Sequence, residues 1–147
     1  MEANIEPKKR IYWSEYIKEI PKNDYFYFRS CIRQTFFPGA EQMFLNILKN
    51  NLNINYFDDP RLTTCTGIGY HGDIIPLETI HTIVARHFSL MNEAGYSNFV
   101  SSCITTFGIM TEALNMWHEF PETLEKTQEN LYKTTGRTFE PQSYRSC

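Results

Sequence analysis

The sequence has little excess charge of either sign: 14 Lys and Arg stand against 17 Asp and Glu, a formal net charge of -3. The basic residues are scattered along the chain and form no stripe. Proteins that hold nucleic acid by its phosphates carry such stripes, because each contact neutralises a phosphate charge. We therefore expect no DNA or RNA partner.

Long hydrophobic runs are also missing. The first residues are charged and have no apolar core, which argues against a secretory signal and favours a cytoplasmic protein. The uncharged stretch 94–111 contains Gly95, Asn98, Gly108 and several hydroxyls, so it is too polar to cross a bilayer. We expect a protein that does not span a membrane.

Cysteine is sparse, with four in 147 residues. In a cytoplasmic chain this does not suggest a disulfide scaffold, and it leaves metal binding, redox chemistry or plain core thiols. No flavin, nucleotide or P-loop signature is present either. Gly67-Ile68-Gly69 is only a fragment of a dinucleotide fingerprint, and it follows no clean strand.

The length fits one globular domain. We place it at residues 23–140, between an N-terminal extension, 1–22, and a tail, 141–147. The extension is predicted to be helical, either as a lid on the domain's own core or as a docking element for a partner subunit. Its apolar residues recur at roughly helical spacing before Pro21: Ile11, Trp13, Tyr16, Ile17 and Ile20.

Hydrophobic periodicity predicts strands alternating with helices, and hence an α/β fold: a small three-layer domain with a short parallel sheet of about three strands. The first two strands and the helix between them suggest a right-handed βαβ unit. Residues 61–73 show no periodicity and are interpreted as a small-residue loop, like a cofactor cradle. The predicted strands are 25–30, 52–57 and 99–103, and the predicted helices lie at about 43–50, 76–94, 104–119 and 121–135.

Three cysteines fall where the predicted strands end. Cys31 ends the first strand, Cys65 lies in the loop after the second, and Cys103 ends the third. Parallel sheets bind ligands beyond the carboxyl ends of their strands, so the three thiols belong at one edge. Cys103 also begins a helix, whose first turn favours a thiolate. Equally, cysteine is a common buried residue, and the three could be plain core thiols.

Several short motifs resemble the cysteine-rich CCG domain of the B-type subunit of heterodisulfide reductase, a domain that recurs in related oxidoreductases. The resemblance covers residues 25 to 140, and Gly136-Arg137 is similar to a Gly-Arg or Gly-Lys after the family's last helix. The motifs are Phe28-Arg29-Ser30-Cys31, Phe37-Pro38-Gly39-Ala40-Glu41, Thr64-Cys65-Thr66-Gly67, Val84-Ala85-Arg86-His87, Ala94-Gly95 and Cys103-Ile104-Thr105-Thr106.

The family pattern has five thiols: a single Cys, a Cys-Cys pair and a Cys-x-x-Cys. Its members typically carry two such domains, and the five thiolates are associated with a non-cubane iron-sulfur cluster that cleaves a disulfide. In this sequence the five positions would hold Cys31, Cys65, Thr66, Cys103 and Thr106, an alignment that fits the spacing better than pairing Thr64 with Cys65. Two of the five are threonine.

The resemblance implies a redox subunit of a multisubunit complex, working by iron-sulfur electron transfer or by reducing disulfides or sulfur compounds. Its partners would be other heterodisulfide-reductase-like subunits or a second copy. Cys31, Cys65 and Cys103 are the candidate catalytic and cluster-binding residues, with His71 as a candidate fourth metal ligand, since His can replace Cys at iron.

The two threonines leave that ligand set incomplete and keep alternatives open. One is a metal-free scaffold subunit of such a complex, and another is a thiol or persulfide carrier that uses Cys103. His71 has a plainer interpretation as a loop histidine exposed to water. The remaining three histidines are predicted on helices, with His87 in the core, while Arg86 is interpreted as structural and Cys147 as a tail thiol.

Overall fold

The computed structural model describes residues 24–63, 65–141 and 145–146. The predicted helical extension, Thr64 and Cys147 lie outside these residues. In chain order the elements are β1 (Tyr25–Phe28), α1 (Cys31–Phe36), α2 (Pro38–Asn46), the π-helical turn η2 (Ile47–Asn51), β2 (Tyr56–Phe57), α3 (Gly67–His71), α4 (Leu77–Glu93), β3 (Asn98–Ser101), α5 (Ile104–Glu119), α6 (Pro121–Thr135) and β4 (Arg145–Ser146).

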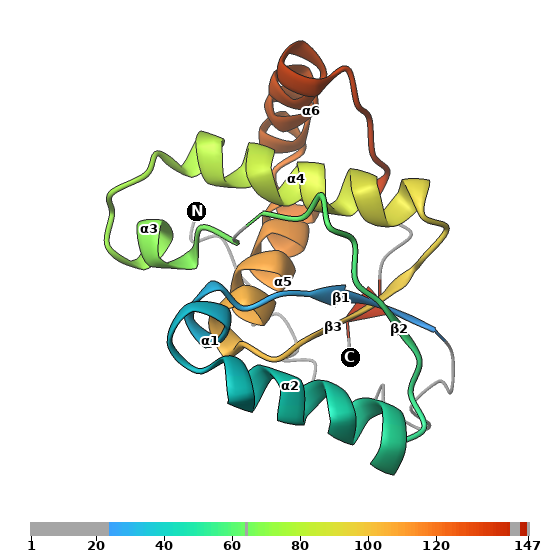
Figure 1. Ribbon diagram of the computed structural model, residues 1–147. Coiled ribbons are helices and arrows are strands. Elements are labelled where there is room, and N and C mark those ends of the chain that lie inside the picture. The colour runs from blue at the N-terminus through green and yellow to red at the C-terminus, as the bar shows by residue number, and fades with distance from the viewer. Residues whose placement is uncertain (1–23, 64, 142–144, 147) are drawn as a thin grey trace, which may run out of the picture.

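The strands form one parallel sheet in the order β2-β1-β3-β4 (Figure 1). This confirms the predicted α/β fold with its short parallel sheet. The fourth strand was not predicted, because its two residues lie in a tail without a hydrophobic pattern. Within the described part of the chain, every helix is too short or too polar to cross a membrane.

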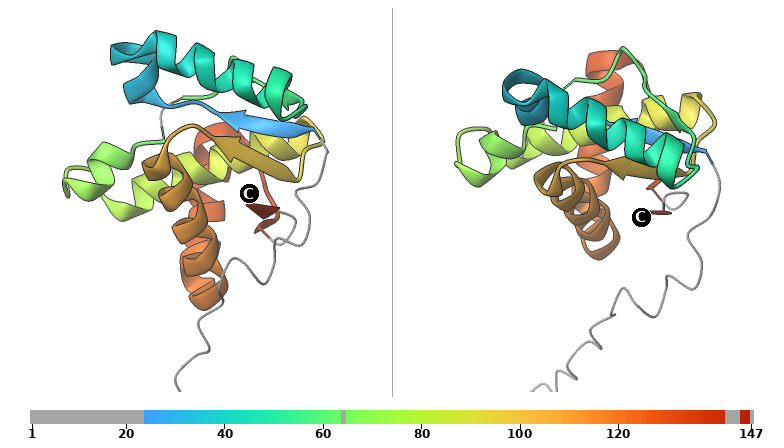
Figure 2. Two further views of the ribbon diagram at one scale, coloured as in Figure 1. Left: turned by 90° about the horizontal axis from the view of Figure 1, so that it is seen from below. Right: turned by 60° about the horizontal axis from the view of Figure 1, so that its bottom comes forward.

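One face of the sheet is covered by α2 and η2, where Tyr27 packs with Leu45 and Leu48. The other face carries the larger core, in which Phe26, Phe28 and Phe99 meet α4, α5 and α6. The side chains of β1 alternate between the two faces, as a pleated strand requires. The two views of Figure 2 show α2 on one side of the strands and α5 and α6 on the other, so the domain has three layers.

The long helices begin and end where the sequence predicts. Gly95 (φ 81°) follows α4, and Gly136 (φ 67°) ends α6; a residue with a side chain would be strained at both positions. Pro121 opens α6, where its missing N–H costs nothing. Trp117 of α5 and Leu131 of α6 are both buried in the larger core.

The short elements differ from the prediction. β1 ends at Phe28 rather than residue 30, so Ser30 and Cys31 belong to the start of α1. β2 has only two residues, and β3 ends at Ser101. Part of the predicted loop 61–73 is the helix α3.

The glycines of α3 have a packing role that the cradle interpretation missed. A Cβ at Gly67 would lie 2.4 Å from Thr105 Cγ2, and one at Gly69 would lie 2.3 Å from Ile75 Cδ1. Both glycines are buried. They therefore let α3 approach α5 and the loop before α4 closely, which a larger residue would prevent.

Candidate functional site

The candidate site lies where the chain leaves β1 and β3. These neighbouring strands lead to helices on opposite faces of the sheet, and in parallel sheets such a switch point forms a crevice beyond the carboxyl ends. Cys31 is the first residue of α1, Cys103 is the N-cap of α5, and Cys65 comes just before α3. Figure 1 shows the starts of α1, α3 and α5 at this same end of the sheet.

The three cysteines are free thiols that lie close enough to influence one another. Cys65 is only 3 % exposed, whereas Cys31 and Cys103 are half-buried. The Thr106 hydroxyl donates to Cys65 Sγ at 3.2 Å, and the Gly67 N–H donates to the same sulfur at 3.4 Å. Thr106, one of the two threonines at family thiol positions, is therefore part of the thiol cluster.

Cys103 ionises more readily than an ordinary cysteine, because its pKa is lowered. Burial alone would raise its pKa, but hydrogen bonds from the backbone and hydroxyl of Thr106, the Ser30 hydroxyl and the Thr105 N–H together lower the pKa below its ordinary value. The start of α5 adds its partial positive charge to the same effect. A thiolate is the reactive form of cysteine, so Cys103 is a better candidate nucleophile than Cys31, whose pKa is raised.

Cys31 behaves in the opposite way. Burial raises its pKa most, and negative charge on Cys65 and on Cys103 raises the pKa further. A thiolate at Cys103 therefore keeps Cys31 in its neutral thiol form. The cluster thus combines one activated sulfur with a protonated neighbour, an arrangement suited to stepwise thiol chemistry.

A buried carboxylate stands behind the cluster, and the sequence pattern does not single it out. Glu41, in the first turn of α2, bonds the Ser102 hydroxyl at 2.7 Å and the hydroxyl of Tyr27. Its only sequence signal is its place in the Pro38-Gly39-Ala40-Glu41 motif. An acidic residue in a first helical turn is ordinary, so the pattern does not reveal that this one is buried.

The ring contact of His71 is with Tyr70 and not with a cysteine. His71 is exposed at the end of α3, and its ring packs edge-on against Tyr70 with centroids 5.3 Å apart. This matches the plainer interpretation of an exposed histidine, although it sits on a short helix rather than in a loop. Its role as a metal ligand stays a prediction.

The residues that would bind an iron-sulfur cluster can be compared with what such a cluster needs. Within residues 24–63, 65–141 and 145–146, no three His, Cys, Asp or Glu side chains are gathered closely enough to hold a metal ion. Two of the five family positions are threonine: the Thr66 hydroxyl donates to the Cys65 carbonyl, and the Thr106 hydroxyl donates to Cys65 Sγ. As arranged, these residues do not fit a ready-made cluster site.

The histidine and arginine of α4 have structural surroundings. His87 is buried, its Nε2 lies 3.0 Å from Thr63 Oγ1, and burial lowers its pKa to about 3, so it is the neutral core histidine that the sequence predicts. Arg86 donates to the Arg61 carbonyl at 2.9 Å. Both contacts hold α4 against the segment after β2.

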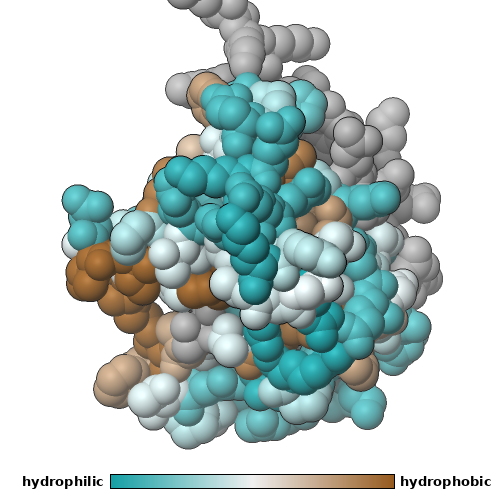
Figure 3. All heavy atoms as spheres, turned by 90° about the horizontal axis from the view of Figure 1, so that it is seen from above, coloured by the Kyte–Doolittle hydropathy of each residue, from teal (hydrophilic) through white to brown (hydrophobic). Residues whose placement is uncertain are grey.

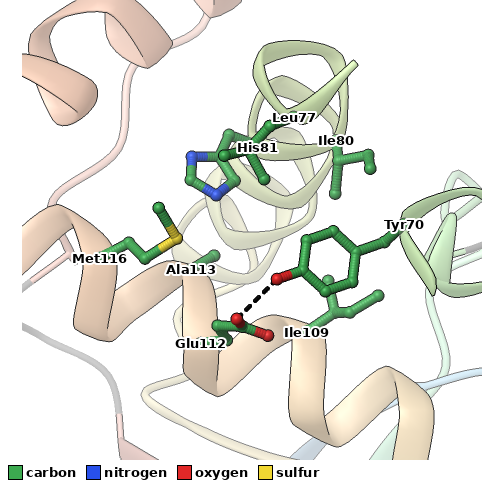
Figure 4. A pocket seen from close by; sticks show the side chains of 8 residues that line it. All are labelled: Tyr70, Leu77, Ile80, His81, Ile109, Glu112, Ala113 and Met116. Carbon is green, nitrogen blue, oxygen red and sulfur yellow. Dashed lines mark hydrogen bonds between the residues drawn. The ribbon is translucent and has the colours of Figure 1, made fainter. Parts of the chain in front are cut away.

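A small hollow lies between α3, α4 and α5 (Figure 4). Tyr70 donates to Glu112 at 2.6 Å on one side of it, and His81 lines the other side. Burial lowers the pKa of His81, so its ring is neutral near pH 7. None of the described cysteines lines this hollow, so it is separate from the thiol cluster.

Comparison with known proteins gives a distant relationship. No family model matches the chain. Over 120 residues it is 29% identical to the B-type subunit of ferredoxin:CoB-CoM heterodisulfide reductase of Methanosarcina acetivorans, an alignment that covers 82% of this chain and 38% of that protein. The chain thus spans well under half the length of this relative. The similarity supports a distant family relationship with this heterodisulfide reductase subunit.

Proposed function

We propose that the chain is a subunit of a heterodisulfide-reductase-like complex and that Cys103 carries out thiol-disulfide exchange there. The observation that carries the proposal is the lowered pKa of Cys103 beside two further thiols at a sheet switch point. In this proposal residues 23–140 act as one CCG-like unit, and residues 1–22 are a helical extension. The similarity to the Methanosarcina protein supplies the class of complex.

The chemistry needs two sulfur nucleophiles in turn. The Cys103 thiolate attacks one sulfur of a disulfide, forms a mixed disulfide and releases the other half as a thiolate. Cys31 then loses its proton to the departing thiolate or to water and attacks Cys103 Sγ. This step releases the second half and leaves a Cys31–Cys103 disulfide. A two-electron donor in a partner subunit, either a dithiol or an electron-transfer centre, reduces that disulfide again.

Cys31 suits the second step better than Cys65. Cys65 is buried and accepts two hydrogen bonds, which hold its sulfur and lower its reactivity. Cys31 is half-buried, and its raised pKa makes its thiolate the stronger nucleophile once formed. We therefore assign attack to Cys103, resolution to Cys31 and a supporting role to Cys65.

The surroundings of the thiols suit a partner subunit of the same complex. Apolar side chains next to or near the cysteines are exposed: Ile104 is 82% exposed, Ile68 59% and Ile32 38%. Figure 3 shows hydrophobic surface gathered over α3 and the segment that follows it.

Trapping the mixed disulfide tests this assignment. With Cys147→Ser as the parent, an aromatic disulfide should release one equivalent of its thiol rapidly at Cys103 and a second as the internal disulfide forms. Cys31→Ser should stop after the first equivalent, and Cys103→Ser should abolish the fast phase, as measured by absorbance and intact mass. A parent whose Cys103 reacts no faster than an exposed thiol peptide would overturn the proposal.

An iron-sulfur centre on Cys31, Cys65 and Cys103 is the second candidate, with His71 as a candidate fourth ligand. It is favoured by the electrostatic influence of Cys65 and Cys103 on Cys31 and by the resemblance to the CCG domain. Iron and sulfide analysis after anaerobic preparation, with electron paramagnetic resonance, tests it. Thr66→Cys with Thr106→Cys should raise iron uptake if the two threonines are lost ligands. If the protein binds no iron and Cys103 does not react rapidly, the remaining candidate is a metal-free scaffold subunit of the complex.

A further inference from the structure

We propose that Glu41 is a positioning residue that fixes the spacing of Cys31 and Cys103 by bonding the residue before each of them. The inference rests on the proposed function, because this spacing matters only if the two sulfurs react in sequence. It assigns a purpose to a buried carboxylate that the exchange chemistry itself does not use. Glu41 touches no reacting atom and acts through its neighbours.

The bonds of Glu41 reach both thiol-bearing segments. Its Oε1 lies 3.4 Å from the backbone N–H of Ser30, the residue before Cys31. Its Oε2 accepts from the hydroxyl of Ser102, the residue before Cys103, at 2.7 Å. One carboxylate on α2 therefore ties the exits of β1 and β3, whose last residues Phe28 and Ser101 are sheet partners.

Tyr27 completes the arrangement from β1. Its hydroxyl donates to Glu41 and lies 3.1 Å from Ser102 Oγ. Burial, followed by its bond to Glu41, raises the pKa of Tyr27 well above its ordinary value, so it stays a donor throughout the physiological range. Glu41 is therefore bonded by three residues: the Tyr27 hydroxyl, the Ser30 N–H and the Ser102 hydroxyl.

Burying this carboxylate is costly, which argues for a role. Glu41 is 3% exposed, and its partners in the described part of the chain are hydroxyls and one backbone amide rather than a cation. An apolar residue would be better suited to this helix face, on which the neighbouring Leu45 packs with Tyr27 of β1. A carboxylate, however, has two oxygen atoms that accept hydrogen bonds in defined directions, and an apolar side chain has none.

Ser30 and Ser102 connect Glu41 to the segments that carry Cys31 and Cys103. Ser30 caps α1, accepting from the Arg33 N–H at 3.2 Å, and its hydroxyl helps to lower the pKa of Cys103. Ser102 directly precedes Cys103, the N-cap of α5, so its bond to Glu41 restrains the chain just before that helix. Loss of the carboxylate would free both exits and widen the range of distances between the two sulfurs.

A trivalent arsenical, phenylarsine oxide, measures that spacing without any turnover. It condenses with two thiols to a cyclic dithioarsenite and one water, and it binds single thiols far more weakly. The parent should be Cys65→Ser with Cys147→Ser, which leaves Cys31 and Cys103 alone. A monofunctional alkylating reagent on the same proteins reports the reactivity of each thiol by itself.

Glu41→Ala should weaken dithiol capture by about tenfold or more, because the second sulfur loses effective concentration. Alkylation of Cys31 and Cys103 should change much less. Glu41→Gln keeps the size and one acceptor and should fall between Glu41→Ala and the parent. The matched control is Asp59→Asn, another buried carboxylate, whose partner is Arg61 and which touches neither serine; it should leave capture within about twofold.

Equal capture by Glu41→Ala and the parent would overturn the inference, as would an equal loss in Asp59→Asn or a parent that captures no arsenical. Circular dichroism on each variant ensures that folded proteins are compared, and Glu41→Gln serves if Glu41→Ala does not fold. A parent that captures the arsenical but does not exchange with disulfides would refute the proposed function alone.

Discussion

The two sides of this domain are built by different means. The α4-α5-α6 side is an apolar core of long helices, in which Phe88, Trp117 and Leu131 are almost completely buried. The thiol edge is made of short elements held by directed polar bonds, such as those of Glu41 and Thr106. The first side supplies stability, whereas the second places three sulfurs. A change on one side should therefore leave the property of the other largely intact.

The largest expected effect comes from the core. Trp117 is 2% exposed and packs against Phe88 and Phe139 with ring centroids 6.2 and 4.9 Å away. Trp117→Ala should lower the free energy of unfolding by about 3–5 kcal/mol, the usual cost of such a cavity. Urea denaturation measures the loss. In the protein that remains folded, the pKa of Cys103 should not change, and a large change would show that the two sides are coupled.

Gly67→Ala tests the edge by overpacking. Its new Cβ would meet Thr105 Cγ2 at 2.4 Å and Cys65 Sγ at 3.3 Å, so α3 must shift from α5. We expect a cost of about 1–3 kcal/mol together with faster alkylation of Cys65, which loses its cover. Gly39→Ala, where a Cβ meets nothing within 4 Å, is the matched control and should leave Cys65 protected.

The core helices and the thiol edge also differ in how well the sequence predicts them. The helices α4, α5 and α6 were predicted almost to the residue, because an apolar stripe of four or five turns and its Pro and Gly signals all agree. The edge was predicted only in outline. Cysteines at strand ends indicate a shared edge, but the two-residue β2 and the five-residue α3 are too short to show a period.

Burial of polar residues was harder to predict. The strand ends placed Cys31, Cys65 and Cys103 at one edge, and the structure brings them within electrostatic reach of one another. Nothing in the pattern distinguished Glu41 from the other acidic residues. A carboxylate becomes a site residue through partners far away in the chain, here Tyr27 and Ser102, and single-sequence patterns do not report such contacts.

Thr106→Val removes one hydroxyl from the edge at nearly constant volume. Because the Thr106 hydroxyl helps to lower the pKa of Cys103, the variant should raise that pKa and slow alkylation of Cys103 at pH 7 by roughly threefold. A pH-rate profile followed by mass spectrometry measures both. An unchanged profile would mean that the α5 start and Ser30 set the pKa without Thr106.

The same variant has a signed effect on stability. The pKa of Cys103 is lowered in the folded chain from its ordinary value of 9.0, so its ionisation adds stability that is fully present above that value and is lost as pH falls through the folded value. Thr106→Val shrinks this contribution. The stability gap between wild type and variant should therefore widen as pH rises between those two values, and urea titrations at several pH values would show it.

The smallest expected effect has the opposite sign and lies beside Cys65. Thr66 has φ 60°, in the left-handed region that a β-branched residue rarely adopts, while its hydroxyl donates to the Cys65 carbonyl at 2.6 Å. Thr66→Gly relieves the strain, worth about 1–2 kcal/mol, but gives up that bond and raises the entropy of the unfolded chain. We expect a net gain of about 0.5 kcal/mol by urea denaturation. Thr66→Ala, which loses the hydroxyl but keeps the strain, should be less stable than wild type; if it is equally stable, the hydroxyl contributes nothing and the strained threonine is held by the edge around it.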